Sequence, residues 1–468
     1  MIVADEKENK IDQAFRDSLA TIDQKGKRNY IFPKKPKGKL YNKRTIASII
    51  YLLFFFTLPW IKVNGEPFIM LNVLKRKFIL FGQIFGPQDF FIFALGMITF
   101  MVFIILFTVV FGRVFCGWAC PQTIFMEMVF RKIEYWIDGD FQKQQQLKAM
   151  AWNGFKIRKR ISKIIIFFLI SFIIANYFMA YLISMDEVLR YVNEGIAAHI
   201  GTFMALMIFS SIFFFVYYWF REQVCIVVCP YGRLQGVLLD KNSIVVAYDY
   251  LRGELRGKKS TSSDIGDCID CKACVRVCPT GIDIRNGTQL ECINCTACID
   301  ACDEIMGNLD RPKKLIKLAS ENNIVKKEKL KITARIKAYS VVLFLILLVL
   351  VSMLATRDEI DITILRTQGM IYQKLPDGQI GNLYTARMYN KTHRDIKMKL
   401  SIPETDGDIE VIGESALIPK ESYAVVTFII KKRPTTIKKR NTKITIDLIA
   451  ENEKTIKKTT NFIGPVLQ

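Results

Sequence analysis

Residues 268–302 read Cys268-Ile-Asp-Cys271-Lys-Ala-Cys274-Val-Arg-Val-Cys278-Pro279, then a spacer, then Cys292-Ile-Asn-Cys295-Thr-Ala-Cys298-Ile-Asp-Ala-Cys302. In each run, three cysteines are separated by two residues and a fourth follows after three more. This is the spacing of bacterial proteins that carry two iron–sulfur clusters, in which the fourth cysteine of each run binds the other cluster. The stretch therefore predicts two [4Fe–4S] clusters, one held by Cys268, Cys271, Cys274 and Cys302 and the other by Cys292, Cys295, Cys298 and Cys278.

Two other uses of cysteine fit this stretch poorly. Structural zinc takes four ligands, usually as two pairs, and not eight cysteines in this rhythm. A disulfide framework needs an oxidising compartment, whereas the charge pattern described below places this stretch in the cytoplasm. The cluster interpretation is therefore the one we carry forward.

The composition is that of a membrane protein. Of 468 residues, 51% are hydrophobic and 34 are Phe, yet the formal net charge is +22. A nucleic-acid-binding protein can be this basic, but it does not also carry long uncharged apolar segments. Basic cytoplasmic segments between membrane helices explain both properties. We therefore expect membrane lipid, and no nucleic acid, among the partners.

Five apolar segments are long enough to cross a bilayer, which takes about 20 helical residues. Lys and Arg are concentrated in the N-terminal tail, in 112–160 and in 221–335, so the positive-inside rule places these parts in the cytoplasm. The tail lacks the apolar stretch of a secretory signal peptide, so none is expected. The expected spans are 45–62, 90–111, 161–183, 197–220 and 336–356.

The predicted fold is a multi-domain membrane protein with a cytoplasmic ferredoxin domain at about 258–310 and an extracytoplasmic C-terminal domain. In the C-terminal domain, short β-branched or alternating runs such as Leu383–Tyr389 and Tyr423–Ile430 are separated by turn residues, which predicts an immunoglobulin-like β-sandwich. All twelve cysteines fall on the cytoplasmic side or at its boundary, where thiols stay reduced and available as ligands. The expected parts are a basic tail (1–44), a four-helix membrane region (45–220), a cytoplasmic segment (221–335), a fifth transmembrane helix (336–356) and the periplasmic domain (357–468).

Two further cysteine pairs lie at the membrane boundary. Cys116-Gly-Trp-Ala-Cys120-Pro follows the second expected span, and Cys225-Ile-Val-Val-Cys229-Pro follows the fourth, so both emerge at the same depth. Each proline can occupy the first turn of a new helix. If the turns are helical, residues four apart share a face and each pair could chelate. Copper, a further Fe–S centre and a redox dithiol all remain open, as does the simpler interpretation that these are buried packing residues.

Histidine is scarce, which limits the chemistry within the membrane. The chain has only His199, near the outer end of the fourth span, and His393 in the outer domain. A bis-histidine haem inside the membrane would need a pair there, so we do not expect haem-mediated transfer. His199 is expected to be a polar residue at the membrane surface, with an ion or quinone contact as the alternative.

Several motifs together resemble the CcoG/FixG/RdxA family of cytochrome c oxidase accessory proteins, and the resemblance covers nearly the whole chain. All eight ferredoxin cysteines and all four boundary cysteines of the family pattern are present. The matching stretches are Cys116-Gly-Trp-Ala-Cys-Pro-Gln-Thr, Cys225–Cys229 with Pro-Tyr-Gly-Arg-Leu-Gln-Gly-Val-Leu-Leu-Asp240, Ala247-Tyr-Asp-Tyr-Leu-Arg-Gly-Glu-Leu-Arg-Gly257 and Cys278-Pro-Thr-Gly-Ile-Asp-Ile-Arg285.

The resemblance implies a bacterial inner-membrane electron-transfer protein, a cupric reductase that converts Cu(II) to Cu(I) for assembly of a cbb-type oxidase. The implied catalytic residues are Cys116, Cys120, Cys225 and Cys229, with an unidentified cytoplasmic electron donor. The implied partners are oxidase assembly factors or a copper transporter, and dimerisation is also considered. One alternative is an electron conduit like the membrane polyferredoxins of nitrate and nitrous-oxide respiration; another is a non-enzymatic redox-sensing scaffold.

Overall fold

The computed structural model describes residues 21, 27–74, 77–86, 89–257, 265–327, 332–367, 369, 371–403, 407–412, 416–420, 422–437, 439–450 and 455–465. The chain divides into two compact units. One contains the chain up to Pro59 together with Gly96–Leu348, and the other contains Trp60–Leu95 and Val349–Gln468. The connection between the first two expected spans therefore belongs with the C-terminal domain, which its sequence did not indicate.

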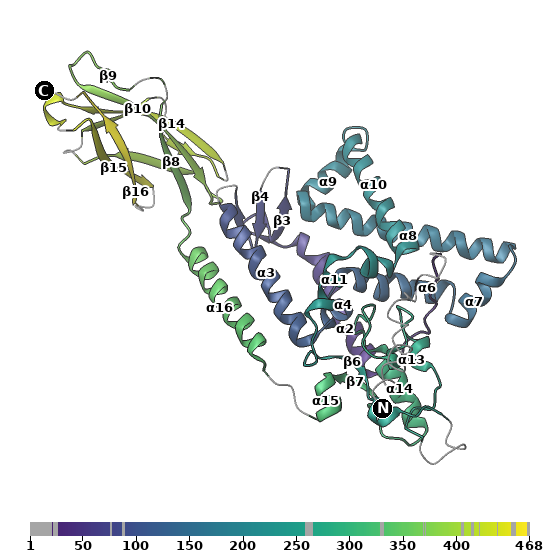
Figure 1. Cartoon of the computed structure of the whole chain (residues 1–468). Coiled ribbons are helices and arrows are strands. Elements are labelled where there is room, and N and C mark those ends of the chain that lie inside the picture. The colour runs from purple at the N-terminus through teal and green to yellow at the C-terminus, as the bar shows by residue number, and fades with distance from the viewer. Residues whose placement is uncertain are drawn as a thin grey trace. The chain divides into compact units, whose positions relative to one another are not determined.

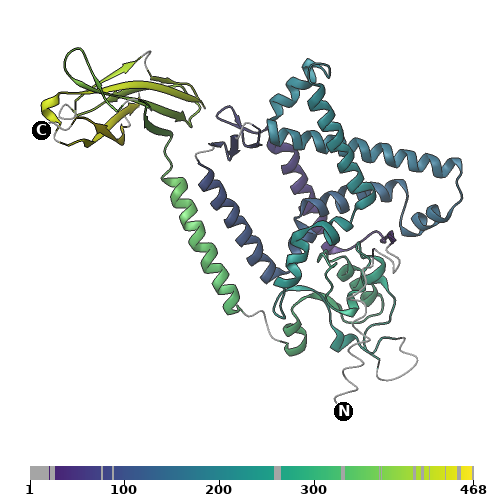
Figure 2. The same cartoon turned by 45° about the horizontal axis from the view of Figure 1, so that its top comes forward.

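Within the described residues, four helices are long and apolar enough to cross a membrane. They are α3 (Phe90–Phe111), α8 (Gly154–Ile183), α10 (Ile200–Phe215) with its π-helical continuation η5 (Val216–Phe220), and α16 (Ala334–Ala355). α8 and α10 lie side by side and α9 (Met185–Glu194) connects them (Figures 1 and 2).

The first expected span, 45–62, lies in α2 (Lys39–Thr57) and the 3-10 turn Leu58–Trp60. This helix starts six residues before the expected span, and its first turns carry Lys39, Lys43 and Arg44, so its apolar part is shorter than those of the other four. That this first expected span crosses the membrane, as a fifth helix beside the other four, stays a prediction.

Short helices connect the spans on the side of the cysteine motifs. After α3 come α4 (Val114–Trp118), α5 (Pro121–Thr123), the π-helix η4 (Ile124–Phe130), α6 (Arg131–Ile137) and α7 (Phe141–Ala149). After α10 come the π-helix η6 (Val224–Val228) and α11 (Pro230–Leu238). π-helical turns are rare and are often found at functional sites.

The ferredoxin region is closed by a two-stranded sheet. β6 (Val245–Tyr248) pairs antiparallel with β7 (Ile316–Ala319), with Val245 opposite Ala319. Between them lie α12 (Tyr250–Gly253), α13 (Ala273–Arg276), the 3-10 turn η7 (Ile284–Asn286) and α14 (Ala297–Asn308); α15 (Glu321–Lys326) follows. Val246, Tyr248 and Leu315 pack with the first-run cysteines in one apolar core. The module thus extends beyond the expected 258–310.

The end of the basic tail (1–44), whose cytoplasmic location stays a prediction, contacts the ferredoxin module. The carboxylate of Asp300, on α14, accepts hydrogen bonds from the backbone N–H groups of Leu40 (3.2 Å) and Tyr41 (2.7 Å). Gly38 precedes α2 without a capping side chain of its own, so Asp300 caps this helix from a distant part of the chain. A Cβ at Gly38 would lie 2.3 Å from Asp300 Cγ, which explains why glycine occupies this position.

The second unit is built from antiparallel sheets. In its C-terminal part, two sheets enclose a core that includes Tyr384, Phe428 and Ile444, all fully buried (Figure 1). The expected runs 383–389 and 423–430 lie within β10 and β14. The strands are β8 (Ile360–Arg366), β9 (Gln373–Lys374), β10 (Ile380–Asn390), β11 (Ile396–Ser401), β12 (Asp408–Ile412), β13 (Ala416–Ile418), β14 (Tyr423–Lys432), β15 (Asn441–Ala450) and β16 (Thr455–Ile463).

The segment 60–95 adds five short strands to this unit. β1 (Lys62–Val63) pairs with β2 (Glu66–Pro67), and β3 (Ile69–Asn72), β4 (Lys77–Leu80) and β5 (Gln83–Phe85) form a three-stranded sheet. Asp89, which follows this sheet, forms ion pairs with Arg357 (2.7 Å) and Lys391 (2.8 Å). These buried contacts attach the segment to the C-terminal domain.

Candidate iron–sulfur and thiol sites

The first group of cysteines lines one hollow. Cys268 and Cys271 come from a loop, Cys274 from α13 and Cys302 from α14, and Tyr248 and Arg285 complete the lining. Burial, together with the nearby thiols of Cys274, Cys268 and Cys271, raises the pKa of the Cys302 thiol to about 12. These are the four residues that the spacing assigns to one cluster.

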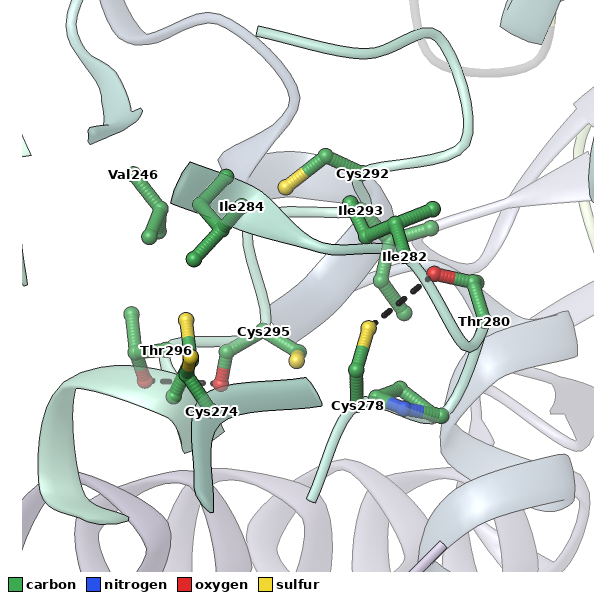
Figure 3. A pocket seen from close by; sticks show the side chains of 12 residues that line it. Val246, Cys274, Cys278, Thr280, Ile282, Ile284, Cys292, Ile293, Cys295 and Thr296 are labelled. Atoms are coloured by element: carbon green, nitrogen blue, oxygen red, sulfur yellow. Dashed lines mark hydrogen bonds between the residues drawn. The ribbon is translucent and has the colours of Figure 1, made fainter. Parts of the chain in front are cut away.

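The second group lines a separate hollow. Cys278, Cys292, Cys295 and Cys298 line it together with Cys274, and Figure 3 labels all of these except Cys298. The hydroxyl of Thr280 lies 3.3 Å from the sulfur of Cys278. Burial raises the pKa of the Cys292 thiol to about 12, and the thiols of Cys278 and Cys295 contribute to the rise. The fourth cysteine of each run therefore lies with the other run, as the two-cluster pattern predicts; ligation itself stays a prediction.

The two runs wrap the chain around their hollows in the same way. In the first run Asp270 and Lys272 have φ values of 52° and 55°, and in the second Asn294 and Thr296 have 52° and 65°. These residues flank the second cysteine of each run. Left-handed residues alternating with extended or right-handed ones turn successive backbone N–H groups inward, and such concave turns are common at Fe–S sites.

The cysteine sets fit [4Fe–4S] clusters chemically. The four thiols assigned to each cluster line one hollow in apolar surroundings, and Cys274 also lines the second hollow. Thiols with pKa values near 12 are protonated at neutral pH, and a bound cationic metal displaces the proton because thiolate is the ligand form. When bound, such clusters supply one-electron transfer at low potential. Among the described residues, no group of three or more His, Cys, Asp or Glu side chains is arranged around a single metal ion.

At the boundary, each cysteine pair bends the chain as the prolines predict. Cys120 and Cys229 immediately precede α5 and α11, with Pro121 and Pro230 in the first turn. We expected each pair to share one helical face if its turn was helical; Cys120 and Cys229 have extended ψ angles (126° and 112°), so the helical turn ends at the second cysteine of each pair. The residue before a proline is disfavoured from helical geometry, so each helix is interrupted at its second cysteine.

Instead, the two pairs approach each other. Burial raises the pKa of the Cys225 thiol to about 12, and the thiols of Cys120 and Cys116 contribute more to this rise than Cys229, four residues away in the same motif. The sulfur of Cys116 also lies 3.4 Å from the side-chain oxygen of Gln235, on the helix that follows Cys229. That the four boundary thiols act as one site stays a prediction.

The boundary site directly contacts the second cluster region. Cys116 packs with Ile293, Cys295 and Val277 in one small apolar core. A Cβ at Gly117 would lie 2.4 Å from the carbonyl oxygen of Ile293, so only glycine allows this approach. The carbonyl of Gly117 in turn accepts a 2.7 Å hydrogen bond from Nε of the buried Arg44.

A buried ion-pair network, which the sequence analysis did not identify, lies beside Cys225. Arg221 donates two hydrogen bonds to Glu134 (3.1 and 2.6 Å), and Lys163 contacts both Glu134 (2.5 Å) and Asp138 (2.9 Å). A hollow lined by Cys225, Glu127, Arg221 and Glu222 adjoins it. No periodicity reveals such a network, because its members come from separate helices.

His199 lies apart from the thiol sites, before α10. Its Nε2 contacts the carboxylate of Glu194, and its ring lies 4.2 Å from that of Tyr191. The imidazole of His199 is therefore held by residues close to it in the sequence.

Comparison with known proteins covers nearly all of these features. Three family models match: a 4Fe–4S dicluster domain over residues 220–321, a 4Fe–4S binding domain over 93–144 and the immunoglobulin-like fold at the C-terminus of FixG over 350–465. Protein RdxA of Cereibacter sphaeroides is 32% identical over 81% of this chain and 83% of its own length. Protein RdxB of the same organism is 33% identical over 84% and 86%.

The chain belongs to the FixG/RdxA family. The nitrogen fixation protein FixG of Rhizobium meliloti is 35% identical over 63% of this chain and 58% of its own. The crystal structure of a FixG-related protein from Vibrio parahaemolyticus aligns with 24% of this chain and 100% of that chain, at 18% identity and a TM-score of 0.20. This FixG/RdxA-family chain is therefore a transmembrane iron–sulfur protein of electron transport with an immunoglobulin-like C-terminal domain.

Proposed function

We propose that this protein takes single electrons from a cytoplasmic donor and reduces Cu(II) to Cu(I) at or near Cys116, Cys120, Cys225 and Cys229. Each Cu(II) substrate ion accepts one electron and becomes Cu(I), and no atom or proton is transferred. The Cu(I) product serves the assembly of a cbb-type cytochrome c oxidase, with assembly factors or a copper transporter as partners.

The contact between Gly117 and Ile293 is the observation that carries the proposal. It places the boundary thiols against the loop that holds Cys292 and Cys295, so an electron held at the second cysteine group is close to a metal held at the boundary. Soft thiolate ligands favour Cu(I) over Cu(II), so the boundary site also stabilises the product. Residues of the first group lie further along the same module and provide the entry side for the donor.

A second function is favoured by a different observation. The two matching 4Fe–4S family models together cover all four boundary cysteines. If these hold a third Fe–S centre, the protein is a membrane electron conduit that delivers electrons to a partner. A redox-sensing scaffold, the third candidate, would show no sustained turnover with either acceptor.

The proposed arrangement in the cell follows from the charge pattern of the loops. We propose that the protein resides in the bacterial inner membrane with its N-terminus and ferredoxin module in the cytoplasm and its C-terminal domain in the periplasm. Cysteine-accessibility labelling from each side of intact cells, using single cysteines introduced in the outer domain, tests this sidedness.

Anaerobic copper reduction tests the proposed activity. The detergent-purified protein is reduced, freed of reductant and mixed with Cu(II) and a chromophoric Cu(I) chelator. We expect one Cu(I) for each electron lost from the clusters. The double variant Cys116→Ser/Cys120→Ser should keep both ferredoxin clusters and lose this reaction. Clusters that stay reduced beside Cu(II) in the unaltered protein would exclude the reductase and favour the conduit.

A further inference from the structure

Among the buried arginines beside the cysteine groups, Arg285 and Arg113 differ in how their charge is balanced. Arg285 lines the first hollow and is 7% exposed. It contacts Asp270 at 2.5 Å and Asp283 at 2.8 and 2.6 Å. Two carboxylates therefore offset its positive charge, so the first cysteine group experiences little net field from it.

Arg113 has no such compensation. It is 4% exposed, and its Nε donates a 2.6 Å hydrogen bond to the neutral amide oxygen of Gln235. Its Nη1 is buried without a hydrogen-bond partner, and within the described part of the chain no carboxylate forms an ion pair with it. A guanidinium cannot lose its proton in a protein, so this buried charge requires a negative group that the protein side chains alone do not provide.

The surroundings of Arg113 show where that negative group belongs. The sulfur of Cys116 lies 3.4 Å from the same Gln235 oxygen. A Cβ on Gly232 would be 3.2 Å from Arg113 Nη2 and 2.6 Å from the carbonyl oxygen of Cys225. The guanidinium therefore lies between the two boundary motifs. Gln235 is fully buried and its Nε2 also has no partner, so a second unused donor lies at the same place.

The influence of Arg113 reaches the second cluster group as well. Gly112, the residue before Arg113, lies against the second run, because a Cβ on Gly112 would be 3.2 Å from Nδ2 of Asn294, between Cys292 and Cys295. Cys116, which shares the Gln235 oxygen with Arg113, packs with Cys295 in one small apolar core. Arg113 is therefore next to the boundary thiols and the second group, whereas Arg285 lines the first hollow.

We propose that Arg113 is the counter-charge of the thiolate-bound centres at the boundary and at Cys278, Cys292, Cys295 and Cys298, and that it sets their reduction potentials above that of the centre at Cys268, Cys271, Cys274 and Cys302. Reduction adds one negative charge to a centre, and an uncompensated positive charge stabilises the reduced form. Electrons then move preferentially from the first group toward the boundary. Arg113 acts through its positive charge beside these centres. The inference rests on the ligand assignment above and does not require copper to be the substrate.

A redox titration without copper tests this. The full chain is purified anaerobically in detergent and its cluster potentials are measured by EPR-monitored titration. In Arg113→Gln the ratio of oxidised to reduced higher-potential cluster, at a fixed solution potential, should rise at least tenfold. This corresponds to a reduction potential lower by 59 mV for one electron. The lower potential should not move. Arg113→Lys, which keeps the charge, should restore most of the difference.

Gln235→Glu provides a second variant that guards against misfolding. A carboxylate at this position would pair with Arg113, so the buried guanidinium stays satisfied while its field is offset. The higher potential should fall as in Arg113→Gln. Arg285→Gln assigns the signals, because it leaves the carboxylates of Asp270 and Asp283 without their cation beside the first hollow and should lower the potential of the first cluster only. Unchanged potentials in Gln235→Glu would overturn the proposal, and so would an equal shift of both clusters. Neither result depends on whether the protein reduces Cu(II).

Discussion

Gly117 faces the carbonyl oxygen of Ile293 so closely that an added Cβ would lie 2.4 Å from that oxygen. One residue belongs to the first boundary motif and the other to the second ferredoxin run. The two motifs are far apart in the sequence but in contact in the structure. A single substitution at Gly117 can therefore test this contact.

Gly117→Ala should weaken this contact. Overpacking of this kind costs about 1–3 kcal/mol, and the displaced boundary loop should slow Cu(I) formation while both ferredoxin clusters stay assembled. Stopped-flow measurement of Cu(I) formation, beside the visible spectrum of the clusters, checks this. Gly154→Ala is a suitable control, because a Cβ there meets no atom within 4 Å. Equal rates in the two variants would mean that the contact has no part in transfer.

Cys271→Ser should remove one ferredoxin cluster and spare the other. Cys271 lines only the first hollow, so iron content should fall from about eight to about four atoms per chain if both sites hold cubanes. Iron analysis and EPR of the reduced protein measure this. Cys292→Ser is the matching variant for the second hollow. Two intact clusters in Cys271→Ser would refute the assignment.

The sequence predicted the parts of these sites that depend on local spacing. Two cysteine runs of fixed rhythm allow few ways of surrounding two clusters, so the grouping of Cys302 with the first run and of Cys278 with the second could be anticipated. Pro121 and Pro230 likewise favour an extended conformation of the preceding cysteine. We expected each cysteine pair to share a face if its turn was helical, whereas the helical turn ends at the second cysteine of each pair.

The parts that escaped prediction depend on contacts between distant residues. Arg113 is hydrogen-bonded to Gln235, 122 residues later in the chain. Asp300 caps a helix by accepting a hydrogen bond from the backbone of Leu40, 260 residues earlier. Each of these residues is unremarkable in its own segment. The strands within 62–85 also escaped notice, because they are short and obtain their stability from the rest of the second unit.

Glu134→Gln should destabilise the first unit strongly. Glu134 is 1% exposed and is shared by Arg221 and Lys163. Its loss leaves Arg221 only the longer contact with Glu222 (4.0 Å) and Lys163 only Asp138, and removing a partner from a buried ion pair costs about 3–5 kcal/mol. A lower apparent melting temperature in detergent measures the effect. Glu321→Gln removes an exposed partner of Lys241 at 3.9 Å and should change stability by at most about 1 kcal/mol. Similar effects of the two variants would show that the buried network does not stabilise the fold.

Asp89 should make the second unit sensitive to acid. Burial raises the pKa of its carboxyl, but hydrogen bonds from Arg357 and Lys391 and their charges outweigh burial, so the pKa lies below its ordinary value. A carboxyl whose pKa is lowered by folding contributes stability above its unfolded pKa of about 3.9, and this contribution is lost as the pH falls through the folded value. We therefore expect stability from this group to be constant near neutral pH and to decline below about pH 4.

Asp89→Asn should remove that acid-dependent component and lower stability at neutral pH, because Arg357 and Lys391 lose their shared carboxylate. Limited proteolysis of the full chain at a series of pH values, scored by loss of the C-terminal domain, measures both effects. Asp377→Asn is the control, since Asp377 lies in an exposed turn and accepts only a local hydrogen bond from the backbone of Gln379. If the two variants show the same pH profile, the three-residue contact does not hold the segment 60–95 to the C-terminal domain.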